Sequence, residues 1–206
     1  MAKKLAIIYA GGGAAGKTTT TKAFVQGEPS EYCEEHIVET RIGNRPMKVS
    51  WTLYGDCAVA GNHHSGTDSN TGPGATKDSF FECLKHRDIA IVDGMISTPK
   101  WATMCNEWQN KFPLNELGVL VVHFDLEAEE LLTRLARRRD VDKESIRNTM
   151  WDKCVALVKR ANLLVKHFED LCELPMTILC VWKEDSVDGI IKLLDEQVDE
   201  YFNGGW

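Results

Sequence analysis

Residues 11 to 18, Gly-Gly-Gly-Ala-Ala-Gly-Lys-Thr, carry the most chemically informative spacing in the sequence. A glycine and four further residues precede the triplet Gly16-Lys17-Thr18, a pattern typical of backbone that cradles phosphates. Glycines let several N–H groups point at one phosphate, and a helix N-terminus adds positive potential. Lys17 would neutralise phosphate charge, and the Thr18 hydroxyl would bind Mg²⁺. The run therefore predicts a site for ATP and Mg²⁺. The residues expected to contact the nucleotide are Gly11, Gly12, Gly13, Ala14, Ala15, Gly16, Lys17, Thr18 and Thr19.

The segments on either side of this run match a strand–loop–helix unit. Leu5 to Tyr9 is a short apolar run typical of a buried strand, and Thr18 to Val25 can form the first turns of a helix. The alternative is a glycine-rich turn without a ligand. That alternative does not account for the spacing, the lysine, the threonine and the flanking elements together.

A second apolar run, Ile89 to Val92, ends in Asp93. In an open parallel sheet, ligands bind outside the carboxyl ends of the strands. Asp93 would then face the same Mg²⁺ as Thr18. The competing interpretation is that Asp93 only caps the following helix.

Arginines are concentrated between residues 134 and 139. Transfer of a phosphoryl group needs cations that close over it and exclude water, and the planar guanidinium binds phosphate oxygens in pairs. We expect Arg134 and Arg138 to act in this way, as part of an arginine-rich lid. Some of these side chains must instead form an ordinary solvated helix face.

The acceptor of a phosphoryl group needs a base or an orienting carboxylate. Asp68 lies in the polar, glycine-rich segment from Gly61 to Gly74, close to Ser65 and Thr67. Long segments of this kind inside compact domains are often functional. Asp56 is the alternative, although it is equally explained as a turn residue. We expect Asp68 to take the role.

The remaining pattern predicts a single α/β domain over residues 1–206, with a mostly parallel sheet between helical layers. Residues 36 to 61 break the alternation and are expected to form a small antiparallel insertion. A helix is expected from Lys143 to Leu171, with apolar residues at intervals of three and four. The expected parallel strands are Leu5–Tyr9, Ile89–Val92, Val119–Phe124 and Met176–Trp182.

Composition limits the classes of function. There is no apolar run of membrane-spanning length, and Met-Ala-Lys-Lys leads directly into the first expected strand, so we expect neither a membrane span nor a signal peptide. Seven scattered cysteines without a CxxC pair are typical of reduced thiols in a cytoplasmic protein. The net charge of −7 does not indicate a general nucleic-acid binder.

With these residues assembled, the chain resembles the P-loop kinases of the nucleoside and nucleotide kinase group. The resemblance covers nearly the whole length: the cradle at Gly11–Thr18, the strand ending in Asp93, the arginine-rich lid, and the final strand and helix. It implies a P-loop NTPase fold and transfer of phosphate from Mg·ATP to a hydroxyl. It also implies that the segment Trp182 to Asp185 touches the adenine.

More narrowly, "AVAGNHHSGTDS" followed by "IVDG" resembles the bacteriophage kinases that phosphorylate 5-hydroxymethyluracil in DNA. This resemblance implies that a hydroxyl-bearing base in DNA is the acceptor, and a host cytoplasm as the setting. A duplex base would have to be extruded or met in a single strand. Two alternatives stay open: a kinase for a free nucleoside, nucleotide or small metabolite, and a nucleotide-binding regulatory ATPase whose long helix from Lys143 to Leu171 presents an interface.

Overall fold

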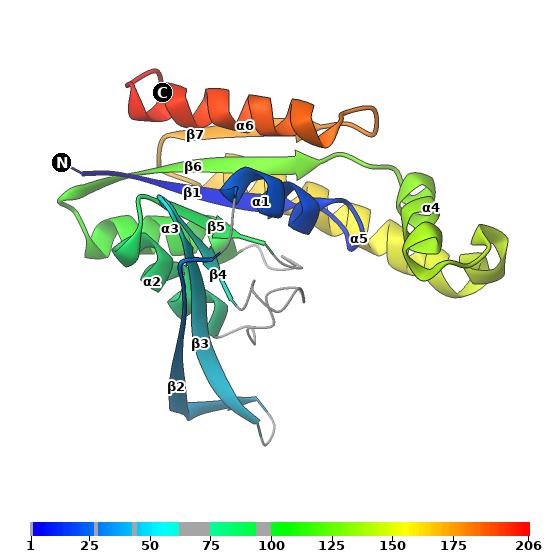
Figure 1. The fold of residues 1–206 in the computed structure, drawn as a ribbon, viewed down its shortest axis with the longest axis horizontal. Helices are drawn as coiled ribbons and strands as arrows, with labels where there is room; N and C mark the ends of the chain where they lie inside the picture. The colour runs from blue at the N-terminus through cyan, green and yellow to red at the C-terminus, as the bar shows by residue number, and fades with distance from the viewer. Residues whose placement is uncertain (1, 27–28, 43–44, 62–74, 94–99) are drawn as a thin grey trace.

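The computed structural model describes residues 2–26, 29–42, 45–61, 75–93 and 100–206. These ranges form a seven-stranded sheet with helices packed against both faces (Figure 1). The strands are β1 (Ala2–Ala10), β2 (Glu31–Ile42), β3 (Arg45–Tyr54), β4 (Cys57–Ala60), β5 (Ile89–Val92), β6 (Asn115–Phe124) and β7 (Met176–Val181). The helices are α1 (Lys17–Val25), α2 (Ala75–His86), α3 (Lys100–Lys111), α4 (Ala128–Arg139), α5 (Lys143–Leu171) and α6 (Val187–Phe202).

The sheet has the strand order β2-β3-β4-β5-β1-β6-β7, and its pairs from β4 to β7 are all parallel. β1 lies between β5 and β6, with Ile8 opposite Val92 and Ala10 opposite His123. The carboxyl ends of the three central strands therefore meet at one edge, which we call the carboxyl edge. The chain order reverses direction at β1, and such a point is where ligands bind in open α/β sheets. The predicted mostly parallel α/β sheet is confirmed.

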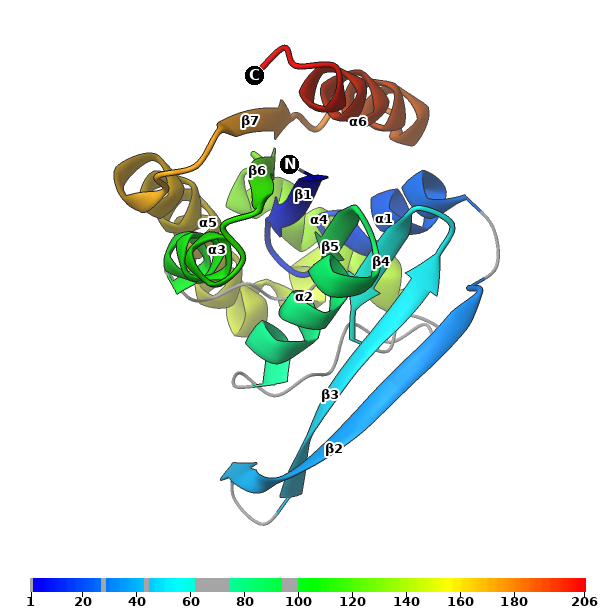
Figure 2. The ribbon, with the colours of Figure 1, turned by 90° about the vertical axis from the view of Figure 1, so that its left-hand side faces the viewer.

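The strand pairing corrects two details of the predicted antiparallel insertion: where it begins and which strands belong to it. β2 and β3 are antiparallel partners, and so are β3 and β4, but β4 also pairs in parallel with β5. β4 is therefore a member of the parallel sheet, and β2 starts at Glu31, five residues before the expected boundary. Figures 1 and 2 show the β2–β3 hairpin extending away from the rest of the molecule.

Helices lie on both faces of the sheet (Figure 2), and a hydrophobic cluster packs on each face. On one face, Phe80 of α2, Trp101 of α3 and Phe168 of α5 pack against alternate residues of the central strands. On the other face, α6 supplies Ile190 and Leu194, and α1 packs beside it. The parallel strands are buried from both sides, as their continuous apolar sequence predicts. Among the described residues, no helix has the length and apolarity that a membrane span requires.

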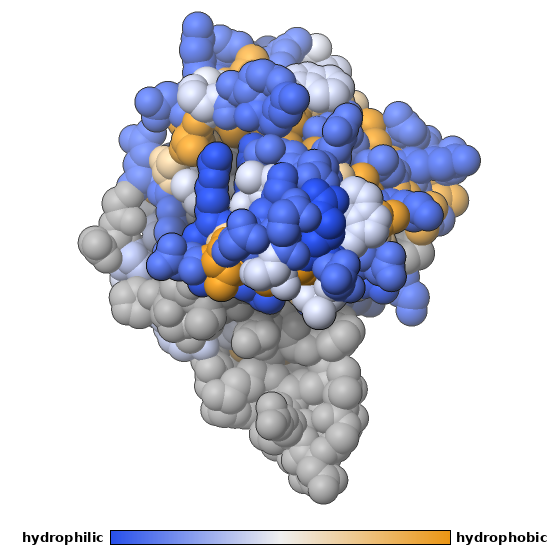
Figure 3. Space-filling model, turned by 90° about the vertical axis from the view of Figure 1, so that its right-hand side faces the viewer, coloured by the Kyte–Doolittle hydropathy of each residue, from blue (hydrophilic) through white to orange (hydrophobic). Residues whose placement is uncertain are grey.

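The α4–α5 hairpin projects past the carboxyl edge of the sheet (Figure 1). α5 runs from Lys143 to Leu171, as its apolar periodicity predicts. A small separate core joins the two helices, and Glu129 of α4 accepts hydrogen bonds from Lys143 and Arg147 of α5 at 2.9 and 2.6 Å. Figure 3 views this end of the molecule, where hydrophilic side chains predominate. The arginines from Arg134 to Arg139 lie on α4 of this hairpin.

Candidate functional site

The loop from Gly11 to Thr18 connects β1 to α1 at the carboxyl edge. Ala14 and Gly16 both have positive φ, 68° and 110°, so the backbone turns sharply before the helix begins at Lys17. Only a glycine adopts the Gly16 conformation without strain. Successive turns of this kind aim neighbouring N–H groups toward a common point, which is how backbone binds anions.

Lys17 lies within this loop. Its side chain is only 7% exposed, and its ammonium donates to the carbonyls of Gly11 and Gly12 at 3.0 and 2.8 Å. A buried ammonium must be compensated by acceptors or by opposite charge. The loop therefore carries a positive charge that is bound to its own carbonyls, and Lys17 is also the first residue of α1.

The threonines after Lys17 divide into two pairs. Thr18 is half-buried and Thr19 is exposed, so both remain near solvent at the first turn of α1. Thr20 and Thr21 are buried, and the Thr21 hydroxyl donates to the Lys17 carbonyl at 3.0 Å. Thr18 and Thr19 are therefore the two threonines of this run that a ligand in solvent can reach. The second pair belongs to the packing of α1 on the sheet.

Asp93 follows β5 directly and is 2% exposed. Because Val92 is opposite Ile8, Asp93 lies beside Tyr9, two residues before the loop starts. Burial raises the pKa of Tyr9, and the Asp93 carboxylate close by raises it further. Asp93 follows β5, and Lys17 begins the helix after the loop that follows β1, so both residues lie at the carboxyl edge, after adjacent strands. Tyr9 was not singled out from the sequence, because an apolar run ending in tyrosine is typical of any buried strand.

The two predicted lid arginines have different environments. The Arg134 guanidinium donates from Nη1 to the Ala15 carbonyl at 2.9 Å and from Nε to Glu130 at 2.8 Å. Arg138, one turn later, is exposed, and within the described ranges it forms no hydrogen bond or ion pair. The structure brings Arg134 to the glycine-rich loop and leaves Arg138 on the projecting surface. Glu130 was missed in the sequence, although its spacing of four residues from Arg134 on a helix is a recognisable signal.

Of the two candidate acceptor carboxylates, Asp56 lies within the described residues. Asp56 lies in the turn before β4, and its carbonyl accepts from the amide of Ile89, the first residue of β5. That position is at the amino edge, roughly 13 Å from the carboxyl edge along a four-residue strand. Asp68 lies outside the described residues. Its segment begins at Gly61, at the carboxyl end of β4, where the amide of Gly61 donates to Ser50 and its carbonyl accepts from Thr52.

Four aromatic residues that could have stacked on a base are part of the core instead. Trp51, Tyr54, Trp101 and Trp108 are each at most 5% exposed. Trp182, after β7 at the carboxyl edge, is 52% exposed, and its amide donates to the Asp185 carboxylate at 2.7 Å. This short turn is the one that the resemblance associates with adenine.

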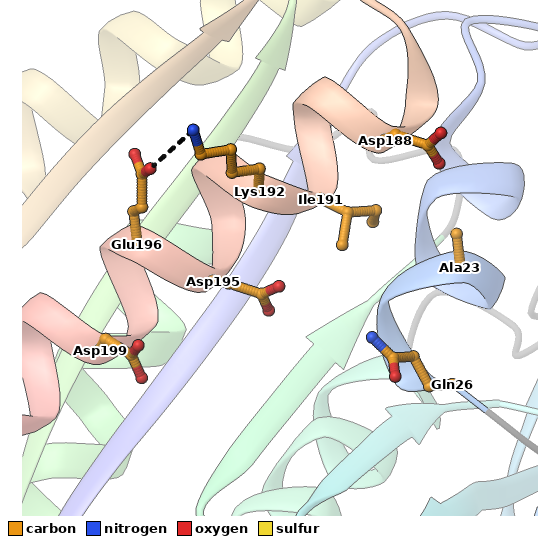
Figure 4. Close-up of a pocket in the computed structure, with 8 residues that line it drawn as sticks. All are labelled: Ala23, Gln26, Asp188, Ile191, Lys192, Asp195, Glu196 and Asp199. Carbon is orange, nitrogen blue, oxygen red and sulfur yellow. Dashed lines mark ion pairs between the residues drawn. The ribbon is translucent and has the colours of Figure 1, made fainter.

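A groove of about 560 Å³ lies between the end of α1 and α6, apart from the glycine-rich loop (Figure 4). Three of its lining residues, Asp188, Asp195 and Asp199, project from α6 toward α1, and Lys192 pairs with Glu196 at 3.8 Å. Burial, followed by the charge of Asp199, raises the pKa of Asp195. Carboxylates repel polyphosphates, so this groove is not the expected nucleotide site.

Within the described ranges, no group of three or more histidine, cysteine, aspartate or glutamate side chains is arranged to hold a metal ion. A magnesium ion that shares its ligands between protein oxygens and nucleotide phosphates does not require such a group. Thr18 and Asp93 have side-chain oxygens of the kind that Mg²⁺ prefers, and they belong to segments that meet at the carboxyl edge. No family model and no curated protein matches this chain.

Proposed function

We propose that this protein is a Mg·ATP-dependent kinase that transfers the γ-phosphoryl group to a hydroxyl. The observation that carries the proposal is the buried Lys17 ammonium in the glycine-rich loop, with Asp93 at the end of the neighbouring strand. An ammonium, a helix N-terminus and a carboxylate at one edge of a parallel sheet fit a nucleotide with its metal ion. A P-loop NTPase fold is part of the proposal.

Each residue has a defined task in this reaction. Lys17 and the loop amides would bind the β- and γ-phosphates, and Thr18 and Asp93 would hold Mg²⁺. When bound, the metal neutralises charge that develops on the phosphates during transfer. Arg134 has N–H groups beyond the two that bind Glu130 and Ala15, so it can also meet a phosphate oxygen. Arg138 and the neighbouring arginines would approach when the hairpin closes over the nucleotide.

We propose the 5-hydroxymethyl group of hydroxymethyluracil in DNA as the acceptor, with Asp68 orienting the hydroxyl. Its support is the sequence from Ala58 to Ser69 and the position of Gly61, which starts the segment at the carboxyl edge. A DNA substrate would meet the exposed arginines Arg137, Arg138 and Arg139 at the end of α4, where phosphate contacts need no base sequence.

A free nucleoside, nucleotide or small metabolite is the second candidate acceptor. The net charge of −7 favours it, because an acidic protein repels a DNA backbone outside any local basic patch. A regulatory ATPase is the alternative of another class, and α5 gives it limited support: its apolar stripe is buried from Met150 to Phe168, whereas Leu171 at the end of the stripe is 46% exposed.

The experiment is transfer of label from γ-labelled ATP to two sets of acceptors offered in parallel. One set is single- and double-stranded DNA containing hydroxymethyluracil, with thymine DNA as the matched control. The other is a panel of free nucleosides and nucleotides. Label in hydroxymethyluracil DNA alone supports the DNA acceptor. Label only in free compounds replaces it with the second candidate, and no label in either set contradicts the kinase.

A further inference from the structure

α4 is attached to the glycine-rich loop at two points. Leu131 packs so closely on Gly12 that a Cβ there would lie 2.6 Å from a Leu131 methyl group. One turn of helix away, Arg134 donates to the Ala15 carbonyl at 2.9 Å, and a Cβ on Gly16 would lie 3.9 Å from the same Nη1. The base of the hairpin and the loop are thus in direct contact, although 119 residues separate Arg134 from Ala15.

The Arg134–Ala15 bond fixes the orientation of one peptide plane. A trans peptide carries its C=O and N–H on opposite edges of the same plane. The bond therefore holds the Ala15 carbonyl toward α4 and turns the Gly16 N–H away from it. Gly16 is the left-handed residue that precedes the helix, where successive N–H groups form an anion-binding concavity.

Glu130 in turn fixes the guanidinium. It accepts from Arg134 Nε at 2.8 Å, and the two side chains are 30% and 27% exposed. The guanidinium is rigid and planar, so holding Nε directs Nη1. A lysine at position 134 would keep the charge but lacks the planar fork that makes both bonds.

We infer that Glu130 is a positioning residue for phosphate binding: it holds Arg134 on the Ala15 carbonyl and thereby aims the Gly16 N–H at the polyphosphate. The inference rests on the proposed function, since it concerns how the same loop binds ATP. It assigns Glu130 a role that does not require contact with the nucleotide. Because Leu131 and Arg134 hold the start of α4 on the loop, any closing movement of the α4–α5 hairpin would involve only its part beyond Arg134.

The test compares Glu130→Met with Glu144→Met. Methionine has similar length and helix propensity but offers no strong acceptor. Glu144 is a matched control because it also lies in the first turn of its helix and pairs with one arginine, Arg147 at 2.9 Å, away from the loop. Affinity for Mg·ATP is measured by calorimetry without acceptor. Hydrogen exchange of the Gly11–Thr18 peptide is measured without nucleotide.

Glu130→Met is expected to weaken ATP binding about tenfold and to speed exchange of the loop peptide, while Glu144→Met changes neither. Arg134→Lys should speed loop exchange similarly, and its exchange rate, measured without nucleotide, serves as the readout if Glu130→Met fails to fold. Unchanged affinity and exchange in folded Glu130→Met, or unchanged exchange in Arg134→Lys, would overturn the inference. If the unmodified protein binds no ATP, the proposed function fails, and loop exchange alone then decides whether Glu130 positions the loop.

Discussion

In the proposed kinase, Lys17 is the residue on which phosphate binding depends most. We predict that Lys17→Ala lowers phosphoryl transfer to every acceptor by at least about 10²–10³-fold, because the charge that matches the transferring group is lost. Lys22→Ala is the control, since Lys22 is an exposed lysine in the last turn of the same helix. Initial rates with labelled ATP give the comparison. Equal rates for the two variants would contradict the role of Lys17.

Asp68 and Asp56 give a second test on single residues. Asp68→Asn keeps size and hydrogen-bonding capacity but removes the charge, so transfer should fall by about 10²-fold or more while ATP still binds. Asp56→Asn should transfer normally, because Asp56 lies at the amino edge of the sheet. The measurements are kcat and the ATP dissociation constant. Normal transfer by both variants would leave the Gly61–Gly74 segment without a catalytic role.

The sequence allowed part of the site to be predicted from local spacing alone. The glycine-rich loop and Asp93 could be predicted, because each is a short motif attached to one apolar strand. The hydrogen bond between Arg134 and Ala15 could not be predicted, because neither segment's sequence indicates which helix packs on the loop. Arg138 illustrates the same limit, since periodicity places it one turn from Arg134 but does not reveal that it faces solvent.

At the scale of elements, the contact between α4 and the glycine-rich loop makes a stability prediction. Gly12→Ala should destabilise the nucleotide-free protein by about 1–3 kcal/mol, because its Cβ would lie 2.6 Å from a methyl group of the buried Leu131 of α4, which would have to move. Gly13→Ala is the matched control, because its Cβ would meet no atom within 4 Å. Its effect should stay within about 0.5 kcal/mol. Urea unfolding measures both, and equal midpoints would show that α4 does not rest on Gly12.

The elements themselves differed in how well sequence predicted them. α5 has a single apolar stripe over 29 residues, and its limits followed from that stripe. We predicted β4 as part of the antiparallel insertion. The sequence of a four-residue strand does not indicate that it also pairs with β5. The start of β6 at Asn115, four residues before the expected Val119, was also missed, because its first residues are polar.

At the scale of the whole molecule, the acidic groove between α1 and α6 links stability to pH. The folded-state pKa of Asp195 is raised, so ionising this carboxyl costs more in the folded protein than in the unfolded chain. The stabilising contribution is present in acid, below the unfolded pKa of about 4, and is lost as the pH rises through the folded pKa. Asp195→Asn should therefore raise the melting temperature at pH 7 and lose this advantage near pH 3.

Asp188→Asn is the control for this prediction. Asp188 lines the same groove and is exposed in the first turn of α6, where a carboxylate favours the helix N-terminus. Its replacement should leave the melting temperature at pH 7 unchanged or slightly lowered. If the melting temperature of Asp195→Asn at pH 7 is equal to or below that of the unmodified protein, the ionised Asp195 carboxylate does not destabilise the folded state.

For the molecule as a whole, we propose that the carboxyl edge around Lys17 and Asp93 is one Mg·ATP site. The most direct test is a calorimetric titration of the unmodified protein with ATP, in the presence and absence of Mg²⁺, repeated with Lys17→Ala. We predict saturable binding of one ATP per chain with a dissociation constant on the order of 1 μM to 1 mM, strengthened by Mg²⁺ and lost in Lys17→Ala. Absence of binding up to millimolar ATP, or equal binding by Lys17→Ala, would contradict the account.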